Sequence, residues 1–314
     1  MKTVKIGTRD SALALAQTNK VADFINSLPD MTTELITMKT IGDKILDRPL
    51  KEVGGKGLFV KELDKVLLSG LSDLSVHSLK DLPSELPEEL PVLGYLPAAD
   101  CRDVLVLPAG LSADIPARLD TQEAKEAFLK VLDPSKPVGT SSPRRVAQLE
   151  KLFPTLTFET VRGNLATRLK KLDEGQYSAI ILASAGLTRL GLVDRISYYF
   201  DERDLLPAAG QGVIAVQGRE GVDYAYLMPL FDAAVGRRVL CERAFVRRLN
   251  GDCSTPAAAH AIETEGKIRL EGYYVNEANG RSARDIIMIE ALDEATMTEK
   301  AYELADRLMA ETAD

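Results

Sequence analysis

The chain has 314 residues, of which 45% are hydrophobic and 27% charged, with no tryptophan and a formal net charge of −8. That length exceeds one simple core and suits two or three domains of roughly 100 residues each. No run of about 18 apolar residues is present, so no membrane-spanning helix is predicted. The acidic balance argues against a general nucleic-acid binder. Arg9 and Asp10 would interrupt an apolar signal core, which predicts a cytoplasmic protein.

The cysteines are Cys101, Cys241 and Cys253. Their odd number and wide spacing argue against a disulfide framework, and the lack of a CxxC motif, with His77 and His260 as the sole histidines, argues against a zinc site. Cys101 and Cys241 are expected to act as small hydrophobic residues. Cys253 differs, because a Gly-Asp-Cys-Ser loop displays a thiol and permits a covalent role.

The first part of the chain predicts a parallel α/β lobe, since strands and helices alternate. The expected elements are a strand over 4–7, a helix over 12–28 with Ser11 as its N-cap, a strand over 34–40, a helix over 59–69 and a strand that ends near His77. The loop from Val53 to Gly57 is rich in glycine but lacks the spacing of a phosphate loop. A flap that carries Lys56 to an anion, or a plain hinge, is therefore favoured over a nucleotide site.

Polar side chains follow the strand that ends near His77. Ser78, Lys80 and Asp81 come after its buried residues, and Pro83 prevents the ladder from continuing. Ligand sites of α/β proteins lie beyond the carboxyl ends of strands, so Asp81 is the candidate catalytic residue. The plain alternative is a turn in which Asp81 caps a backbone amide and Lys80 is solvated.

A second α/β pattern begins near Val138 and predicts a second lobe. Its expected elements are a strand near 138, helices over 143–152, 165–172 and 185–190, and strands over 156–161 and 179–182. Another strand, at 103–107, is expected earlier in the chain. Residues 110–136 are interpreted as an insertion, with a helix from Thr121 to about Leu132. The apolar strand over 213–216 suits the first sheet, so the chain is expected to cross between the lobes twice.

The last part of the chain has a different texture, with strands followed by one helix, which is typical of a small antiparallel α+β domain. The expected elements are helices over 223–235 and 237–250, strands over 257–262, 267–274 and 285–290, and a helix over 295–309. The predicted domains are residues 1–103 with 208–231, residues 104–207, and residues 232–314.

Basic residues gather in the second lobe. From Ser142 to Lys171 the chain carries seven lysines or arginines and two glutamates, although the whole protein is acidic. Arg144 and Arg145 fall in the first turn of a helix, where the macrodipole disfavours cations by about 0.3–1 kcal/mol each. Arg162 repeats the arrangement at the next strand end. A cleft for a small ligand with several negative groups is the prediction.

Several motifs together resemble the porphobilinogen deaminase (hydroxymethylbilane synthase) family over nearly the whole chain. They are Gly7-Thr8-Arg9-Asp10-Ser11, Val53-Gly54-Gly55-Lys56-Gly57-Leu58-Phe59, His77-Ser78-Leu79-Lys80-Asp81-Leu82-Pro83, Gly139-Thr140-Ser141-Ser142 with Arg144-Arg145, Arg162-Gly163-Asn164, Ala209-Gly210-Gln211-Gly212 and the Cys253 loop. The resemblance implies three domains, the first two similar to type II periplasmic binding proteins. It implies a dipyrromethane cofactor joined to Cys253 by a thioether, to which four porphobilinogen molecules are added with loss of ammonia.

The resemblance also implies the roles of individual residues. Asp81 would be catalytic, because an ionised carboxylate stabilises the methylene-pyrrolenine cation left when ammonia departs. The residues implied to hold the carboxylates of the cofactor and the growing chain are Arg9, Ser11, Lys56, Ser78, Lys80, Thr140, Ser142, Arg144, Arg145, Arg162, Arg168 and Arg189. No metal is implied, and the expected protein is a monomer that passes hydroxymethylbilane to uroporphyrinogen-III synthase.

Two positions depart from the family pattern. Glu52 stands where many relatives have lysine, and Asp252 stands beside Cys253 where glycine is common. A two-lobed binding protein for a small polycarboxylate remains an alternative, but it would need neither the cysteine loop nor Asp81. A phosphate-ester enzyme or nucleotide binder is a weaker alternative, because metal ligands and the required glycine spacing are missing.

Overall fold

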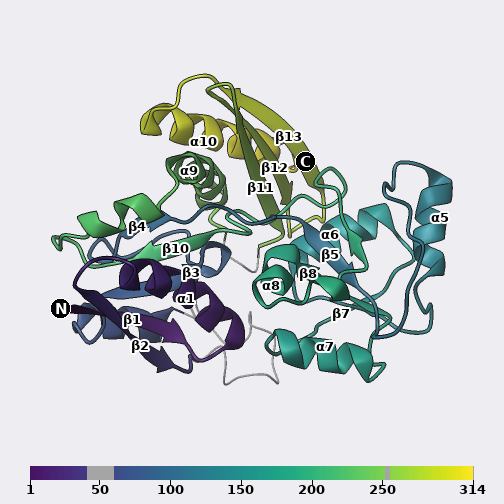
Figure 1. Cartoon of the computed structure of the whole chain (residues 1–314). Coiled ribbons are helices and arrows are strands. Elements are labelled where there is room, and N and C mark those ends of the chain that lie inside the picture. Colours follow the sequence, from purple (N-terminus) through teal and green to yellow (C-terminus); the bar gives the residue numbers. More distant parts are fainter. Residues whose placement is uncertain (41–59, 252–254, 314) are drawn as a thin grey trace.

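The computed structural model describes residues 1–40, 60–251 and 255–313. These residues form two five-stranded mixed sheets and one three-stranded antiparallel sheet (Figure 1). Two α/β lobes lie side by side, and the three-stranded unit lies above them with α10 on its outer side. This arrangement confirms the expected mixture of two α/β lobes and a small α+β unit.

The first sheet has the strand order β2-β1-β3-β10-β4. β1 pairs in parallel with β2 and β3, whereas β10 runs antiparallel to β3 and β4. The strands are β1 (Lys2–Arg9), β2 (Met31–Met38), β3 (Leu74–Ser78), β4 (Val92–Tyr95) and β10 (Ile214–Gln217), and the helices are α1 (Ala12–Asn26) and α4 (Lys61–Leu68). The return of the 213–216 segment to this sheet, predicted from its apolar run, is confirmed.

The second sheet has the order β7-β6-β8-β5-β9. Its strands are β5 (Asp103–Val106), β6 (Val138–Gly139), β7 (Phe158–Glu159), β8 (Ala179–Ala183) and β9 (Tyr198–Tyr199), and its helices are α5 (Gln122–Lys130), α6 (Pro143–Leu152), α7 (Leu165–Asp173), α8 (Ser184–Arg189) and the short η2 (Val193–Arg195). Phe128 of α5 stacks on Phe153 with ring centroids 4.7 Å apart. The 110–136 segment, interpreted as an insertion, therefore supplies part of this lobe's core.

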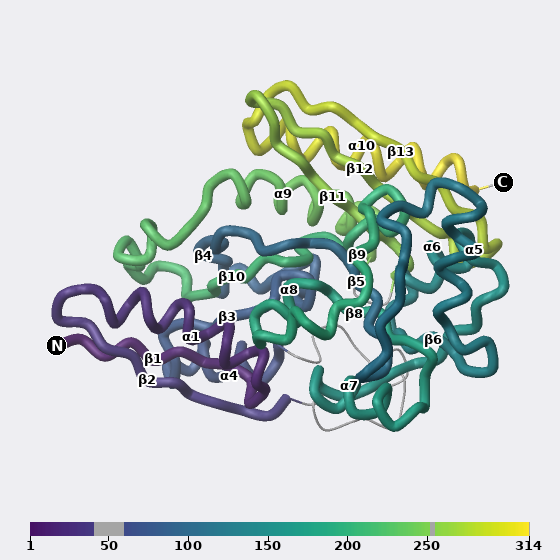
Figure 2. The backbone as a smooth tube through the Cα atoms, turned by 45° about the vertical axis from the view of Figure 1, so that its right-hand side comes forward, coloured from purple at the N-terminus to yellow at the C-terminus, as the bar shows by residue number. Residues whose placement is uncertain are grey.

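Two chain segments connect the lobes, as expected. The first runs from β4 to β5 and the second from β9 to β10, and they lie against each other between the lobes (Figure 2). The amide of Ala99 donates to the carbonyl of Gly212 at 3.1 Å, and the side-chain amide of Gln211 donates to the carbonyl of Cys101 at 2.6 Å. These hydrogen bonds join the two crossing segments to each other.

The third unit is a meander of β11 (Ala257–Thr264), β12 (Lys267–Val275) and β13 (Ser282–Ile289). Helices α9 (Ala233–Arg248) and α10 (Glu294–Glu311) pack against one face of this sheet around Phe245, Leu270 and Leu304. Asp232 and Asp293 cap the starts of the two helices by accepting hydrogen bonds from backbone amides. The three strands followed by a helix confirm the predicted α+β organisation of this unit. The domain limits stay a prediction.

The structure differs from the sequence predictions at one place and contains two strands that were not predicted. The expected helices over 223–235 and 237–250 are a short 3₁₀ helix η3 (Ala225–Leu230) and the single helix α9. Pro229 lies inside the first segment and prevents a longer helix there. Asp232 caps the start of α9, and α9 continues through Gly236. β4 was not predicted, because the prolines around 83–97 argue against a strand. β4 is an edge strand of the first sheet, and edge strands tolerate flanking prolines. The two-residue strand β9 carries too little pattern to be detected.

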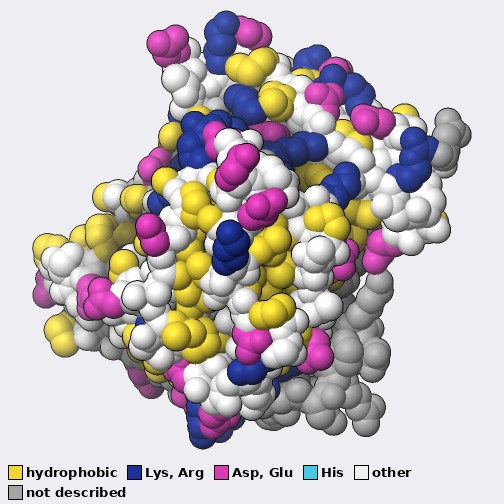
Figure 3. Space-filling model, turned by 90° about the vertical axis from the view of Figure 1, so that its right-hand side faces the viewer, with side chains coloured by type: hydrophobic (Ala, Val, Ile, Leu, Met, Phe, Trp, Pro, Cys, Tyr) yellow, Lys and Arg dark blue, Asp and Glu magenta, His cyan; other side chains and the backbone are white. Residues whose placement is uncertain are grey.

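The arginine excess of the second lobe does not form a basic outer face. On the side of the molecule that lies at the right in Figure 1, acidic and basic side chains alternate (Figure 3). Arg144 and Arg145 are instead buried, with 3% and 6% of their surface exposed. Among the described residues, no helix combines the length and apolarity that crossing a membrane would need.

Candidate active site

The backbone around Asp81 is fixed by the first sheet. β3 ends at Ser78, as predicted, and a single 3₁₀ turn, η1 (Leu79–Asp81), follows. Leu79 is fully buried and its amide donates to the carbonyl of Val213 on the neighbouring segment, which anchors the turn. Asp81 is half-buried, and within the described residues no hydrogen bond reaches its carboxylate. The turn therefore presents Asp81 at the surface of the lobe instead of using it as a cap.

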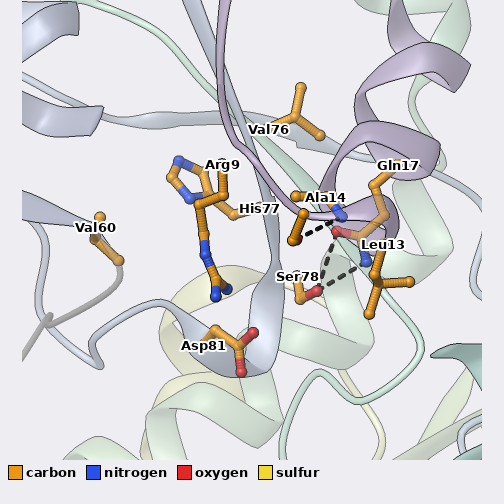
Figure 4. A pocket seen from close by; sticks show the side chains of 10 residues that line it. Arg9, Leu13, Ala14, Gln17, Val60, Val76, His77, Ser78 and Asp81 are labelled. Atoms are coloured by element: carbon orange, nitrogen blue, oxygen red, sulfur yellow. Dashed lines mark hydrogen bonds between the residues drawn. The ribbon is translucent and has the colours of Figure 1, made fainter. Parts of the chain in front are cut away.

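A small cavity of about 50 Å³ lies beside Asp81 (Figure 4). Its lining comes from β1, α1, β3, η1 and the starts of α1 and α4, and consists of Arg9, Ser11, Leu13, Ala14, Gln17, Val60, Val76, His77, Ser78 and Asp81. Figure 4 shows the guanidinium of Arg9 extended toward the Asp81 carboxylate. The cavity is far smaller than a site for a drug-sized ligand, which is usually about 300–1,000 Å³, so it can hold only one end of such a ligand.

The hydroxyls at this cavity are already engaged by the protein. Ser11 caps α1, because its Oγ accepts from the amide of Ala14 at 3.3 Å, which confirms its predicted N-cap position. Gln17, 2% exposed, donates from Nε2 to the Oγ of Ser78 at 2.8 Å. The orientation of the Ser78 hydroxyl is therefore set by Gln17, a residue that the sequence did not single out.

His77 lies under the cavity in a neutral state. Burial lowers the pKa of this imidazole to about 4, although the nearby side chain of Gln217 favours the charged form. The positive charge of Arg9 acts in the same direction as burial. Near neutral pH, His77 thus offers an uncharged ring beside the cavity and not a second cation.

Lys80 links the first lobe to the crossing segments. Its Nζ donates to the Oε1 of Gln211 at 3.2 Å. Burial, together with the nearby charges of Arg145 and Arg144, lowers the pKa of Lys80 to about 8, while Asp81 and Asp103 act in the opposite direction. Lys80 therefore lies among two cations and two carboxylates, and burial is the main cause of its lowered pKa.

Asp103, at the start of β5, holds the two arginines that open α6. Nη2 of Arg144 lies 2.7 Å from Oδ2 of Asp103, and Nη2 of Arg145 lies 2.7 Å from Oδ1. Gln211 donates to the same carboxylate at 3.0 Å. Burial alone would raise the pKa of Asp103, but the two guanidiniums and Gln211 hold it at about 2. A buried carboxylate thus compensates the unfavourable position of these arginines in the first turn.

The hydroxyls that precede α6 are arranged by the backbone of the second lobe. Thr140 is 3% exposed, and its Oγ1 accepts from the amide of Ser142 at 3.3 Å. Ser142 occupies the N-cap position, as predicted, but its side chain makes no capping hydrogen bond. Its hydroxyl is therefore not committed to the helix start.

Three further arginines of the second lobe lie near this network. Arg168 donates from Nε to the carbonyl of Gly163 at 2.8 Å, and burial with the charges of Arg145 and Arg162 lowers its pKa to about 10. Asp81 acts on Arg168 in the opposite direction, which places the two side chains within electrostatic range across the lobes. Arg189 donates to the carbonyl of Gly212 on the second crossing, and burial lowers its pKa to about 10.

Two predicted site residues, Lys56 and Cys253, lie outside the described residues. The structure brings Arg9, Ser11 and Ser78 together at the cavity beside Asp81, and it brings Arg144 and Arg145 together at Asp103. The sequence reasoning missed Gln17, Gln211 and Asp103. Gln211 could have been identified from the sequence, because it lies in the Ala209-Gly210-Gln211-Gly212 motif. Asp103 could not, because its position at the start of a strand is its only distinguishing feature.

The charges of this region suit an anionic ligand. Among the described residues, the cations outnumber the carboxylates of Asp81 and Asp103; they are Arg9, Lys80, Arg144, Arg145, Arg162, Arg168 and Arg189. Cations lower one another's pKa at Lys80, Arg144 and Arg168. A ligand with several carboxylates would relieve that repulsion.

Comparison with known proteins gives a consistent picture. Residues 4–225 match the family model "Porphobilinogen deaminase, dipyromethane cofactor binding domain", and residues 237–311 match "Porphobilinogen deaminase, C-terminal domain". A curated protein named porphobilinogen deaminase from Ruminiclostridium cellulolyticum is 47% identical over 292 residues, 91% of this chain and 92% of that protein. One from Thiobacillus denitrificans is 42% identical over 318 residues, 100% of this chain and 97% of that protein.

Solved structures were also compared. The periplasmic VFT2 domain of BvgS from Bordetella pertussis is 16% identical, with a TM-score of 0.40 over 73% of this chain and 84% of that chain. A likeness of this strength carries no argument about the site. The residues around Asp81 and Asp103 are therefore interpreted from their own geometry.

Proposed function

Because the chain belongs to the porphobilinogen deaminase family, we propose that it is a transferase that condenses four porphobilinogen molecules head to tail and releases hydroxymethylbilane for tetrapyrrole biosynthesis. The observation that carries the proposal is Asp81, a half-buried carboxylate at the end of β3 that faces a cavity and lies within electrostatic range of arginines from both lobes. A polycarboxylate-binding protein would need the cations but not this carboxylate.

The donor set fits a dipyrromethane cofactor, which carries several carboxylates. The excess of cations described above, and the lowered pKa values of Lys80 and Arg168, are features that such a polyanion would offset. When bound, the cofactor supplies the pyrrole carbon to which the first substrate unit is attached. We propose Cys253 as its attachment point and Lys56 as one of its contacts; both residues lie outside the described part of the chain.

Asp81 would act on the substrate during the loss of ammonia. The bond between the aminomethyl carbon and nitrogen of porphobilinogen breaks, and the carbon left behind is electron-poor. A fixed negative charge stabilises that centre most strongly where water is partly excluded. As a new carbon–carbon bond forms, the pyrrole carbon that is attacked loses a proton, and a carboxylate at this position can accept it.

The cations would have two different tasks. We propose that Arg9, Lys80, Arg162, Arg168 and Arg189 bind acetate and propionate groups, since an arginine fork matches a carboxylate. Arg144 and Arg145 already share the buried Asp103, so they would contribute as a positioned pair. The hydroxyls of Ser11, Ser78, Thr140 and Ser142 complete the proposed set of contacts.

The surroundings of the enzyme are proposed from the family. We infer a cytoplasmic monomer that acts without nucleic acid or membrane and passes its product to uroporphyrinogen-III synthase. Hydroxymethylbilane is a reactive linear tetrapyrrole, so an enzyme that closes the ring must consume it.

The proposal is tested by incubating the purified protein with porphobilinogen and measuring ammonia and bilane together. We expect four ammonia molecules for each bilane. Whole-protein mass should exceed the sequence mass by a dipyrromethane, and Cys253→Ser should lack that mass whereas Cys241→Ala keeps it. Binding of porphobilinogen without ammonia release would instead identify a polycarboxylate-binding protein.

A further inference from the structure

Three side chains with metal-binding atoms meet where the crossing segments contact the third unit. Cys101 lies on the first crossing, Glu202 follows β9 on the second, and His260 is on β11. The Sγ of Cys101 lies 3.3 Å from Oε1 of Glu202 and 3.9 Å from Nε2 of His260. Nε2 of His260 lies 3.4 Å from Oε2 of Glu202. The cluster lies outside the proposed active site, and the proposed reaction does not use it.

These separations match the edges of a tetrahedral zinc site. With zinc bonds of about 2.3 Å to sulfur, 2.0–2.1 Å to imidazole nitrogen and 2.0–2.2 Å to carboxylate oxygen, two ligand atoms at a tetrahedral angle are about 3.4–3.6 Å apart. The three distances, 3.3, 3.4 and 3.9 Å, bracket that range, with Cys101 facing Oε1 and His260 facing Oε2 of Glu202. One ligand atom from each side chain lies within 4.8 Å of the other two, so a turn of the Glu202 carboxylate together with small shifts would bring the three side chains onto one ion.

A carboxylate also lies near the second nitrogen of His260, where zinc-bound histidines usually have a hydrogen-bond partner. Its Nδ1 lies 3.6 Å from Oε1 of Glu242, a carboxylate whose side chain is 7% exposed. Glu242 is held in turn, because its carboxylate accepts from the amides of Gly210 at 2.7 Å and Ala261 at 2.8 Å. A carboxylate at the far nitrogen directs Nε2 toward the metal and strengthens the ligand.

We propose that Cys101, Glu202 and His260 form a binding site for one Zn²⁺ ion, with water in the fourth position. A thiolate, an imidazole and a carboxylate are a ligand set that zinc accepts, and a thiolate disfavours Mg²⁺ and Ca²⁺. Glu202 is 34% exposed at its side chain and Cys101 is half-buried, so an ion can enter from solvent. Three ligands with one open position are the pattern of a zinc site that keeps a water molecule.

The location of this site means that a bound ion would restrain several parts of the chain. Its ligands come from both crossings between the lobes and from the third unit, which also carries Cys253. A bound ion would fix these three segments to one another. Without metal, the imidazole of His260 lies between the carboxylates of Glu202 and Glu242, and that polar cluster is the alternative explanation of the same contacts.

Metal titration of the intact protein distinguishes the two explanations. The purified holoenzyme is freed of metal with a chelator and titrated with Zn²⁺ against a chromophoric competitor, and separately with Co²⁺. We expect one equivalent of either ion, a near-ultraviolet band from thiolate-bound cobalt, and a higher Tm with Zn²⁺. Cys101→Ser should abolish the band and weaken Zn²⁺ binding at least about tenfold, as should His260→Gln.

Cys241→Ala is the matched control, because it removes a buried thiol that lies outside the cluster. It should keep the stoichiometry and the cobalt band. The proposal is overturned if wild-type protein binds no equivalent of Zn²⁺ with saturation, or if Cys101→Ser binds it as tightly as wild type. If His260→Gln fails to fold, Cys101→Ser and the cobalt spectrum still decide. Neither readout depends on turnover, so this outcome is separate from that of the proposed function.

Discussion

Asp81 ends β3 in the first lobe and Asp103 begins β5 in the second, and the two carboxylates have different surroundings. Asp103 is fully buried and shared by Arg144, Arg145 and Gln211. Asp81 is half-buried beside a cavity, and no hydrogen bond from a described residue reaches its carboxylate. A carboxylate whose partners are all supplied by the fold maintains the fold, whereas one whose partners are incomplete is available to a ligand.

The largest expected effect is the loss of stability in Asp103→Asn. The change leaves Arg144 and Arg145 close together in the interior without a negative charge. Removing one partner of a buried ion pair costs about 3–5 kcal/mol, so the free energy of unfolding should fall by that amount in a denaturant titration. Asp100→Asn is the control, because its pair with Arg102 is 32% and 41% exposed and should matter by less than about 1 kcal/mol. Equal losses in both variants would contradict the structural role of Asp103.

The same residue gives a pH dependence with a defined sign. The pKa of Asp103 is about 2 in the folded protein and 3.8 ordinarily, so the folded state favours its charged form. Its contribution to stability is therefore complete above about pH 4 and is lost as the pH falls toward 2. In Asp103→Asn the free energy of unfolding should decline less steeply over that interval. An acid limb identical to that of wild type would show that Asp103 does not titrate as described.

The second effect is on the rate of reaction in Asp81→Asn. This change keeps the shape and removes the charge, so turnover should fall on the order of 10²–10³-fold, the loss typical of one preorganised stabiliser. The free energy of unfolding should change by less than about 1 kcal/mol, opposite to Asp103→Asn. Asp81→Glu retains the charge and should keep more activity than Asp81→Asn. Single-turnover ammonia release, with cofactor content checked by mass, measures the difference; equal rates for the two variants would reduce Asp81 to a turn residue.

The third comparison concerns Arg144 and Arg162. The dipole argument by itself predicts that loss of either arginine raises stability slightly, but Asp103 reverses that expectation for Arg144. Arg144→Leu should lower the free energy of unfolding by several kcal/mol. Arg162 is half-buried and is not one of the two arginines paired with Asp103, so Arg162→Leu should leave stability nearly unchanged and lower kcat/KM roughly 10- to 100-fold, the worth of a charged hydrogen bond. Unfolding and steady-state assays of both variants separate these roles.

Most of the fold follows from local pattern. Apolar strands and capped helices could be predicted because each depends on neighbours in the sequence. The apolar run at 213–216 also indicated its return to the first sheet, although its partners β3 and β4 are distant in the chain. Gly236 was interpreted as a helix break, yet the Asp232 cap and packing of α9 carry the helix through it. β4 was hidden by flanking prolines, which an edge strand tolerates.

The site was predictable only in part. Asp81 could be placed because the strand end and Pro83 are adjacent to it. Asp103 and Arg144 are 41 positions apart in the sequence and are paired by the tertiary fold. The local sequence pattern around either residue therefore does not indicate their ion pair. The argument against a zinc site considered only spacing along the chain, so it could not include the approach of Cys101 and His260, which the fold brings together.

The smallest expected effect is a change in KM on substitution of Gln17. This substitution tests whether a buried side chain contributes to ligand binding as well as to folding. Gln17 is 2% exposed, like a core residue, but it lines the cavity and orients the hydroxyl of Ser78. Gln17→Ala should raise KM about fivefold, the worth of one hydrogen bond of about 1 kcal/mol, with kcat nearly unchanged. Gln176→Ala, which removes an exposed amide, is the control and should change neither constant. If Gln17 acts through Ser78, then Ser78→Ala should cause a similar rise in KM, and the double variant should be little worse than either single one. Additive effects would mean that the two residues contribute independently, because side chains coupled by a shared contact deviate from additivity by about 0.5–3 kcal/mol.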